Sequence, residues 1–206
     1  MQTTPTTPVP LYLASSSPRR RQLLEALGLS FQVVPSETDE KHPDVTTLTD
    51  ILTENAVAKA RAGFQAAGDE KGLAIGADTL VAVNEKVLGK PKNPADVVSM
   101  LHALSGRSHT VMTGVALVTS GKVTHFVETS KVVFRLLSDQ EIVAYSRIQE
   151  PYDKAGSYAV QGASCVFIEK IEGSYTNVMG LPTERLLRQL EVHTAIPVFE
   201  WFPGHK

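Results

Sequence analysis

Hydrophobic periodicity predicts a chain in which helices and strands alternate before a long hairpin. Apolar residues recur at helical spacing from Leu48 to Ala67, which predicts a long amphipathic helix. The nearly continuous apolar run LAIGADTLVAV, from Leu73 to Val83, has the length and composition of a buried strand. Two β-rich runs follow, Thr110–Val118 and Val123–Leu136, and a Ser-Gly turn separates them.

Shorter patterns supply the remaining elements. Strands are expected at Leu11–Ala14, Phe31–Val34, Val87–Leu88 and Cys165–Ile171, and helices at Ser17–Leu27, Val97–Leu104, Ser138–Tyr145 and Thr183–Leu190. Helices that alternate with strands, followed by a hairpin, indicate an α/β fold with a sheet of mixed direction. No linker rich in proline, glycine or serine divides the chain. We therefore expect one two-lobed domain over residues 11–206 with a central cleft, preceded by a disordered leader over residues 1–10.

Composition narrows the range of partners. Among 206 residues, 20 basic and 22 acidic side chains give a formal net charge of −2, which argues against binding nucleic acid or a membrane through bulk charge. A single cysteine, Cys165, permits no intrachain disulfide and fits a reducing compartment. No apolar run approaches the ~20 residues of a membrane span, and the Thr/Pro-rich start does not resemble a signal peptide. We expect a cytoplasmic protein.

The stretch ASSSPRRR, residues 14–21, places three arginines where a helix is expected to begin. Cations are unfavourable there, because the N-terminus is the positive end of the helix dipole. Helical geometry puts Arg20 in line with the apolar stripe and Arg19 beside it, whereas Arg21 points away. The segment is either a solvated basic turn or a phosphate cradle, in which Ser15 and its neighbours add hydroxyl donors to the arginines and the free backbone N–H groups.

Two charged residues lie where the pattern predicts burial. Asp78 stands in the middle of the strand 73–83, on the same face as Gly76, which leaves room for a close approach. A buried carboxylate is costly unless it is paired, so Asp78 is either half of a structural ion pair or a metal ligand or general base. Lys59 falls in the apolar sector of the helix 48–67, where it either extends to the rim or reaches into the cleft as a phosphate ligand.

Three further signals are weak when taken singly. Lys90 lies in the loop LGKP, and Glu40 ends the acidic segment SETDE, where a carboxylate is able to join Asp78 around a divalent ion. In the loop DKAGSYAVQG, Gln161 has the donor and acceptor needed to read an amide-like edge, although such a glycine loop is also an ordinary structural feature. Together, cations for phosphates, carboxylates for a metal and an amide for a base favour an enzyme that cleaves a phosphoanhydride.

Missing motifs exclude other hydrolase classes. The sequence contains no GxxxxGK[ST] loop, no Cys/His zinc spacing, no HExxH pattern and no GxSxG turn. These absences argue against a P-loop NTPase, a zinc enzyme and a serine hydrolase.

An ordered set of segments resembles the Maf family of nucleotide pyrophosphatases. From about Leu11 to Leu190 the chain carries, in order, LASSSPRRRQLLEALG, SETDE, NAVAKAR, IGADTLV, LGKP, LSGRSHTVMTGVAL, EPYDKAGSYAVQG and IEGSYTNVMGLP. The resemblance implies a two-lobed, ITPase-like (Maf/Ham1 type) α/β fold and a homodimer. It also implies hydrolysis of a nucleoside triphosphate between the α and β phosphates, with a divalent cation, Mg²⁺ or Mn²⁺.

The resemblance also implies roles for particular residues. The aspartate of the family's GADT motif, here Asp78, is expected to be the proton acceptor. Phosphate binding falls to Ser15, Arg20, Lys59 and Lys90, and metal binding to Glu40 and Asp78.

Three positions assign the chain to a branch of the family. Arg19, Thr79 and Gln161 are similar to the branch that prefers dTTP and UTP, with a role in nucleotide-pool cleaning or in cell-division arrest. One alternative is a pyrophosphatase for modified purine nucleotides such as 7-methyl-GTP. Another is a nucleotide-sensing division regulator that does not hydrolyse, against which the intact Asp78, Lys59 and Lys90 argue.

Overall fold

The computed structural model describes residues 8–35, 38–39, 41, 47–84, 86–148 and 150–202. The strands in this part of the chain are β1 (Leu11–Leu13), β2 (Gln32–Val33), β3 (Leu73–Val83), β4 (Lys86–Leu88), β5 (Ser108–Val118), β6 (Val123–Phe134) and β7 (Ile168–Glu172). The α-helices are α1 (Pro18–Ala26), α2 (Leu48–Ala67), α3 (Pro94–Leu104), α4 (Asp139–Ser146), α5 (Tyr175–Val178) and α6 (Thr183–Thr194). Short 3₁₀ helices are η1 (Glu150–Asp153), η2 (Ala155–Ser157), η3 (Ala163–Phe167) and η4 (Val198–Trp201).

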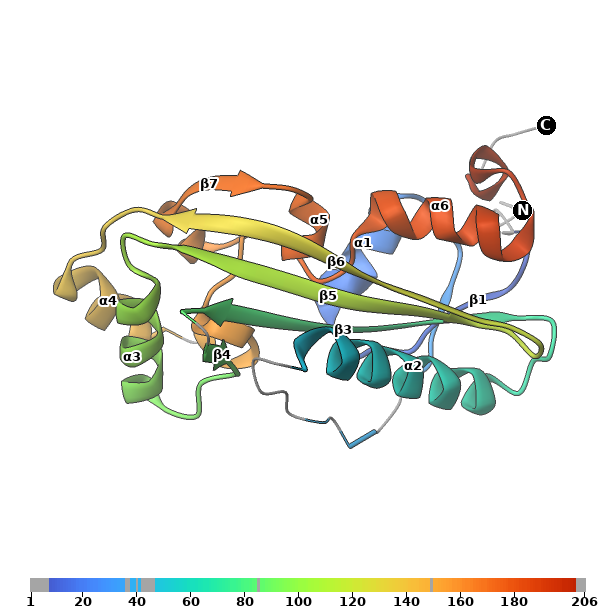
Figure 1. Cartoon of the computed structure of the whole chain (residues 1–206), viewed down its shortest axis with the longest axis horizontal. Helices are drawn as coiled ribbons and strands as arrows, with labels where there is room; N and C mark the ends of the chain where they lie inside the picture. The colour runs from blue at the N-terminus through green and yellow to red at the C-terminus, as the bar shows by residue number, and fades with distance from the viewer. Residues whose placement is uncertain are drawn as a thin grey trace, which may run out of the picture.

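The described strands form one long, twisted sheet (Figure 1). Its order is β2-β1-β3-β5-β6-β7, and β4 pairs with β3 outside this path. Strand β1 runs parallel to β2 and β3, whereas the pairs β3–β4, β3–β5, β5–β6 and β6–β7 are antiparallel. The predicted α/β fold with a sheet of mixed direction is therefore confirmed. Residues 1–7 of the expected leader lie outside the described residues.

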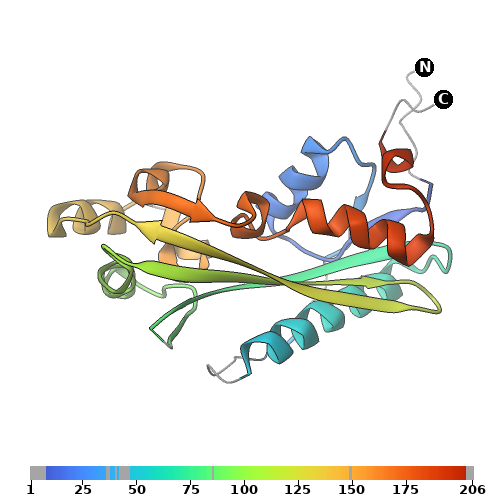
Figure 2. The ribbon, with the colours of Figure 1, turned by 45° about the horizontal axis from the view of Figure 1, so that its top comes forward.

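Helices cover both faces of the sheet, as Figures 1 and 2 show. Helix α2 runs along one face, and α1 and α6 lie on the other. Helices α3 and α4 lie at the open end of the β5–β6 hairpin, opposite its turn. None of the described helices has the length and apolar character needed to cross a bilayer.

Two large hydrophobic clusters form the core and give the molecule its two lobes. The first lies under α1 and α6 and includes Leu13, Leu24, Ile75, Leu117, Leu186 and Trp201. The second lies beside α3 and α4 and includes Val97, Leu101, Val132, Phe134, Ile142 and Phe167. Trp201, only 1% exposed, shows that the C-terminal segment covers the first cluster.

One predicted strand is wrong over its first part. The strand expected at Cys165–Ile171 is a 3₁₀ turn as far as Phe167, and β7 begins at Ile168. The ring of Phe167 packs against Tyr145 and Phe134, and the backbone N–H of Arg135 donates to the Phe167 carbonyl at 3.0 Å. The burial of this aromatic side chain therefore outweighs the β propensity of the segment and favours the 3₁₀ turn.

Helix α2 approaches the sheet unusually closely, because glycines stand beneath it. A Cβ atom on Gly76 would lie 2.3 Å from the carbonyl oxygen of Ala56 and 2.5 Å from the nitrogen of Ala60. A Cβ atom on Gly114 would lie 2.6 Å from the carbonyl oxygen of Leu52. The space beside Gly76 that the sequence suggested for an approaching group is therefore filled by the backbone of α2.

Substitution of Gly114 tests this close packing. We expect Gly114→Ala to lower the free energy of unfolding by about 1–3 kcal/mol, because its methyl group collides with backbone that cannot move independently. Urea unfolding measures the change. The control is Gly121→Ala in the hairpin turn, where an added Cβ meets nothing within 4 Å, and we expect a change below about 0.5 kcal/mol. Equal stability of the two variants would contradict the packing argument.

Candidate active site

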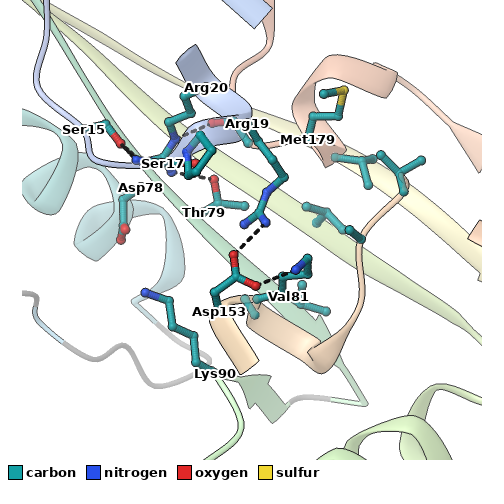
Figure 3. Close-up of a pocket in the computed structure, with 18 of the residues that line it drawn as sticks. Ser15, Ser17, Arg19, Arg20, Asp78, Thr79, Val81, Lys90, Asp153 and Met179 are labelled. Carbon is teal, nitrogen blue, oxygen red and sulfur yellow. Dashed lines mark hydrogen bonds and ion pairs between the residues drawn. The ribbon is translucent and has the colours of Figure 1, made fainter. Parts of the chain in front are cut away.

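A pocket of about 380 Å³ lies between the two lobes, and Figure 3 shows the side chains that line it. Residues from both hydrophobic clusters contribute to its apolar lining, among them Met179 from the first cluster and Tyr158 from the second. The polar lining comes from the β1–α1 turn, the first turn of α1, α2, β3, the loop at Lys90, and the segment 153–160. The expected central cleft is confirmed.

Most of the residues singled out from the sequence meet in this pocket. Seven of the nine line it: Ser15, Arg19, Arg20, Lys59, Asp78, Thr79 and Lys90. Glu40 lies outside the described residues, so its expected metal-binding role stays a prediction. Gln161 is exposed and does not belong to the lining, although the preceding Val160 does.

The carboxylate of Asp78 is held by two side chains from helix α2. Lys59 Nζ donates to Asp78 Oδ1 at 2.8 Å, and Asn55 Nδ2 donates to Oδ2 at 2.9 Å. The Lys59 side chain is 9% exposed and that of Asp78 is 17% exposed. The ion pair anticipated for a structural aspartate is therefore present, and it lines the pocket at the same time.

Asn55 is a site residue that the sequence interpretation missed. It is 4% exposed, and its position four residues before Lys59 puts both side chains on one face of α2. That spacing was the available signal, because an asparagine on the buried face of a helix needs polar partners.

Arg20 is oriented by three neutral oxygen acceptors. Its Nε donates to the Gly180 carbonyl at 2.8 Å, one Nη to Ser15 Oγ at 3.1 Å, and the other to Thr79 Oγ1 at 3.0 Å. Because it is only 9% exposed, the guanidinium is inside the pocket wall, as the helical stripe predicted. Neutral acceptors fix the direction of the cation without an opposing charge of their own.

Thr79 takes part in a chain of hydrogen bonds rather than standing alone. Its hydroxyl accepts from Arg20 and lies 3.0 Å from Thr113 Oγ1, which in turn donates to the Asn177 carbonyl at 3.2 Å. Thr113 and Asn177 are fully buried. Thr79 therefore connects the pocket arginine to the interior of the sheet.

The three arginines of the first helical turn point in different directions. Arg19 reaches Asp153 across the pocket at 3.2 Å (Figure 3), whereas Arg21 is exposed and pairs with Glu25 on its own helix. Ser17 occupies the N-cap position, but its side chain makes no capping hydrogen bond with the described first turn. Instead, the Ser17 N–H donates to Ser15 Oγ at 3.2 Å.

Asp153 and Lys154 add charge at the rim of the pocket. Burial acts to raise the pKa of Asp153, but its contacts with Lys154 and Arg19 lower the pKa overall. Counted over the described residues, the lining holds five cationic side chains and two carboxylates, in a chain whose net charge is −2. The pocket is thus a local positive site suited to a polyanion.

The donor set fits a metal only if a bound ligand completes the coordination. Among the described residues, no group of three His, Cys, Asp or Glu side chains is arranged to hold an ion. Mg²⁺, however, is often held by one or two carboxylates together with substrate phosphates and water. Asp78 is a carboxylate positioned in the pocket for that role.

His109 supports the pocket wall from behind. Its Nε2 lies 2.6 Å from the hydroxyl of Tyr158, a lining residue, and its ring packs edge-on against Phe134. Burial lowers the pKa of His109 to about 4 and raises the pKa of Tyr158. The imidazole is therefore neutral at neutral pH.

Comparison with known proteins finds similarity over most of the chain. The family model described as Maf-like protein matches residues 10–193. Proteins named dTTP/UTP pyrophosphatase from Bacillus cereus (strain AH820) and Bacillus anthracis are each 42% identical over 181 residues, which cover 88% of this chain and 94% of theirs. Among solved structures, the Staphylococcus aureus Ham1 protein is 14% identical, with a TM-score of 0.43 over 60% of this chain and 71% of its own.

The buried His109 predicts a specific loss of stability in acid. An ordinary histidine pKa of 6.5 in the unfolded chain and about 4 in the folded chain means that the unfolded state binds more protons between these values. The contribution of His109 to the free energy of unfolding is therefore fully present above pH 6.5, and it is lost as the pH drops toward 4. We expect a loss of about 2 kcal/mol between pH 7.5 and pH 5 from this group.

Urea unfolding at the two pH values tests this expectation. His109→Gln retains a side chain able to bond the Tyr158 hydroxyl but cannot titrate, so its stability should depend less on pH than that of the wild type. His125→Gln, at an exposed position of β6, is the matched control and should keep the wild-type dependence. An unchanged pH dependence in His109→Gln would refute the assignment.

Proposed function

Because the chain belongs to the Maf family, we propose that it is a pyrophosphatase that hydrolyses dTTP and UTP to the nucleoside monophosphate and pyrophosphate. Relatives with that name are 42% identical to this chain over 181 residues, which make up 88% of its length, and this supports the assignment to a nucleotide hydrolase. The alternatives considered from the sequence, a purine-directed enzyme and a non-hydrolysing sensor, become outcomes of the experiments below.

The observation that carries the proposal is the placement of the Asp78 carboxylate among several cations in one pocket. Asp78 faces the cavity together with Arg20, Lys59 and Lys90. Catalysis of phosphoanhydride cleavage is largely a matter of positioning and of stabilising negative charge on oxygen. This cavity lies within the range of about 300–1,000 Å³ that is typical of small-ligand sites.

The proposed reaction is attack of water on the α phosphorus. A water molecule forms the new bond to phosphorus and gives a proton to the Asp78 carboxylate, while the bond from the α phosphorus to the oxygen that bridges the α and β phosphates breaks. Pyrophosphate departs with the electron pair of that bond. The phosphate oxygens are bound by Ser15, Arg20, Lys59 and Lys90. Lys59 also donates a hydrogen bond to the Asp78 carboxylate.

A divalent cation, Mg²⁺ or Mn²⁺, belongs to the proposal. When bound, it supplies neutralisation of phosphate charge and a more acidic water. Asp78 is the described residue that would hold it, and Glu40 stays the second expected ligand.

Selectivity for thymine and uracil is assigned to Arg19, Thr79 and Gln161. The amide of Gln161 is proposed to pair with the O4/N3 edge of the base, which offers one acceptor and one donor. Thr79 acts, in this proposal, by holding Arg20. The homodimer and the cytoplasmic location expected from the sequence stay predictions.

Product analysis with a nucleotide panel tests the proposed function. The purified protein is incubated with dTTP, UTP, CTP, ITP or 7-methyl-GTP, in the presence of Mg²⁺ or Mn²⁺, and pyrophosphate and monophosphate are measured. We expect dTTP and UTP each to give monophosphate and pyrophosphate, one molecule of each for every triphosphate hydrolysed. Turnover restricted to ITP or 7-methyl-GTP would support the purine-directed enzyme, and binding without turnover would support the sensor.

Asp78→Asn is expected to remove the proton acceptor while preserving the shape of the site. We predict that kcat for dTTP falls by about 10²–10⁴-fold, with nucleotide binding retained in calorimetric titration. Asp139→Asn, at an exposed position in α4, is the matched control and should keep wild-type turnover. A kcat near the wild-type value in Asp78→Asn would exclude this residue from the reaction.

Gln161→Glu tests the proposed reading of the base. Replacement of the amide by a carboxylate removes the donor, so the ratio of kcat/KM for dTTP to that for 7-methyl-GTP should fall about tenfold, because a polar group left unpaired costs about 1–3 kcal/mol. An unchanged ratio would mean that Gln161, an exposed residue beside the pocket, does not contact the base.

A further inference from the structure

We propose that Asn55 is a positioning residue for the Asp78 carboxylate, an inference that rests on the proposed function. Asn55 is one helical turn from Lys59, and each of the two residues holds a different oxygen of Asp78. Lys59 supplies the charge, and Asn55 sets the plane of the carboxylate.

Three hydrogen bonds hold the side-chain amide of Asn55 in place. Its Nδ2 donates to Asp78 Oδ2 at 2.9 Å and to the Lys41 carbonyl at 3.0 Å, and its Oδ1 accepts from the Lys41 N–H at 3.0 Å. The backbone N–H and C=O of Lys41 therefore decide which end of the amide is nitrogen. With that orientation fixed, an N–H of Asn55 must face Asp78.

A lysine alone would leave the carboxylate free to turn. The ammonium group is a point charge on a flexible stem, so a single contact at Oδ1 permits rotation about the bond to the carboxylate. Asn55 adds a second contact at Oδ2 from a planar group anchored on both sides. An ionised carboxylate has about four acceptor sites, so acceptor sites not used by these two bonds remain for a water.

Asn55 acts through Asp78 and not on the nucleotide. The side chain is 4% exposed and does not belong to the pocket lining, whereas Lys59 and Asp78 do. Loss of its contact should therefore disturb the reacting geometry more than the binding of substrate. Displacement of a reacting group by about 1 Å can cost up to about 10²-fold in rate.

The experiment compares Asn55→Leu with the wild type in steady-state kinetics on dTTP. Leucine fills a similar volume without a donor, so kcat should fall by about 10- to 100-fold while KM changes less than twofold. Thermal unfolding establishes that the variant is folded. If Asn55→Leu does not fold, Asn55→Ala takes its place and carries the same expectation.

Glu54→Gln is the matched control, because Glu54 precedes Asn55 and also contacts Lys41. Its carboxylate receives the Lys41 ammonium at 2.6 Å, with both side chains more than half exposed, and it does not touch Asp78. Exposed pairs of this kind contribute little, so Glu54→Gln should keep the wild-type kcat and KM.

The outcomes distinguish failure of the proposed pyrophosphatase function from failure of the positioning role of Asn55. Absence of pyrophosphate release by the wild type would overturn the proposed function and this inference with it. An active wild type together with an unchanged kcat in the Asn55 variant, or a rise in KM that accounts for the loss, would overturn the positioning role alone. A lowered kcat at constant KM, with a normal Glu54→Gln control, supports it.

Discussion

The close contact between helix α2 and the sheet is the constraint on which the site depends. Gly76 and Gly114 lie under this helix, and Gly114 is the register partner of Asp78 on the neighbouring strand. Without side chains at these two positions, the helix backbone rests against the strands. Only at that distance do Asn55 and Lys59 reach the carboxylate of Asp78 from above. The absence of a side chain at Gly76 therefore determines the geometry of the Asp78 carboxylate, two positions further along β3.

Electrostatics explains why such a costly arrangement is retained. A buried ion pair seldom adds much to stability, because the desolvation of both charges offsets their attraction. Here the pair of Lys59 and Asp78 lines a pocket that also contains Arg20, which neutral acceptors hold in place. In the proposed function, a polyanionic ligand would bind this cationic lining and would occupy the helix start, where the arginines alone are unfavourable. Arg19 and Arg20, which are unfavourable at the start of an isolated helix, thus line the pocket proposed to bind the nucleotide.

Sequence patterns predicted elements well where one physical signal dominated. The long helix at Leu48–Ala67 and the strand at Leu73–Val83 have the predicted bounds, because periodicity and apolar content agree there. The directions of Arg20 and Arg21 followed from helical geometry alone. Asn55 was missed because its partners come from segments distant in the chain, and η3 was missed because Phe167 is placed by tertiary packing. Gln161, which was proposed from its glycine loop as well as from the family resemblance, is exposed beside the pocket, and its contact with a base stays a prediction.

The most direct test of the account is a crystal structure of the protein with a non-hydrolysable α,β-imido analogue of dUTP and Mg²⁺. The account predicts that the α phosphorus faces Asp78 with a water between them, and that the outer phosphates lie among Ser15, Arg20 and Lys90. It also predicts that the Asp78 carboxylate keeps its contacts with Asn55 and Lys59. A nucleotide bound in the opposite direction, with its base beside Asp78 and its phosphates away from the arginines, would contradict the account.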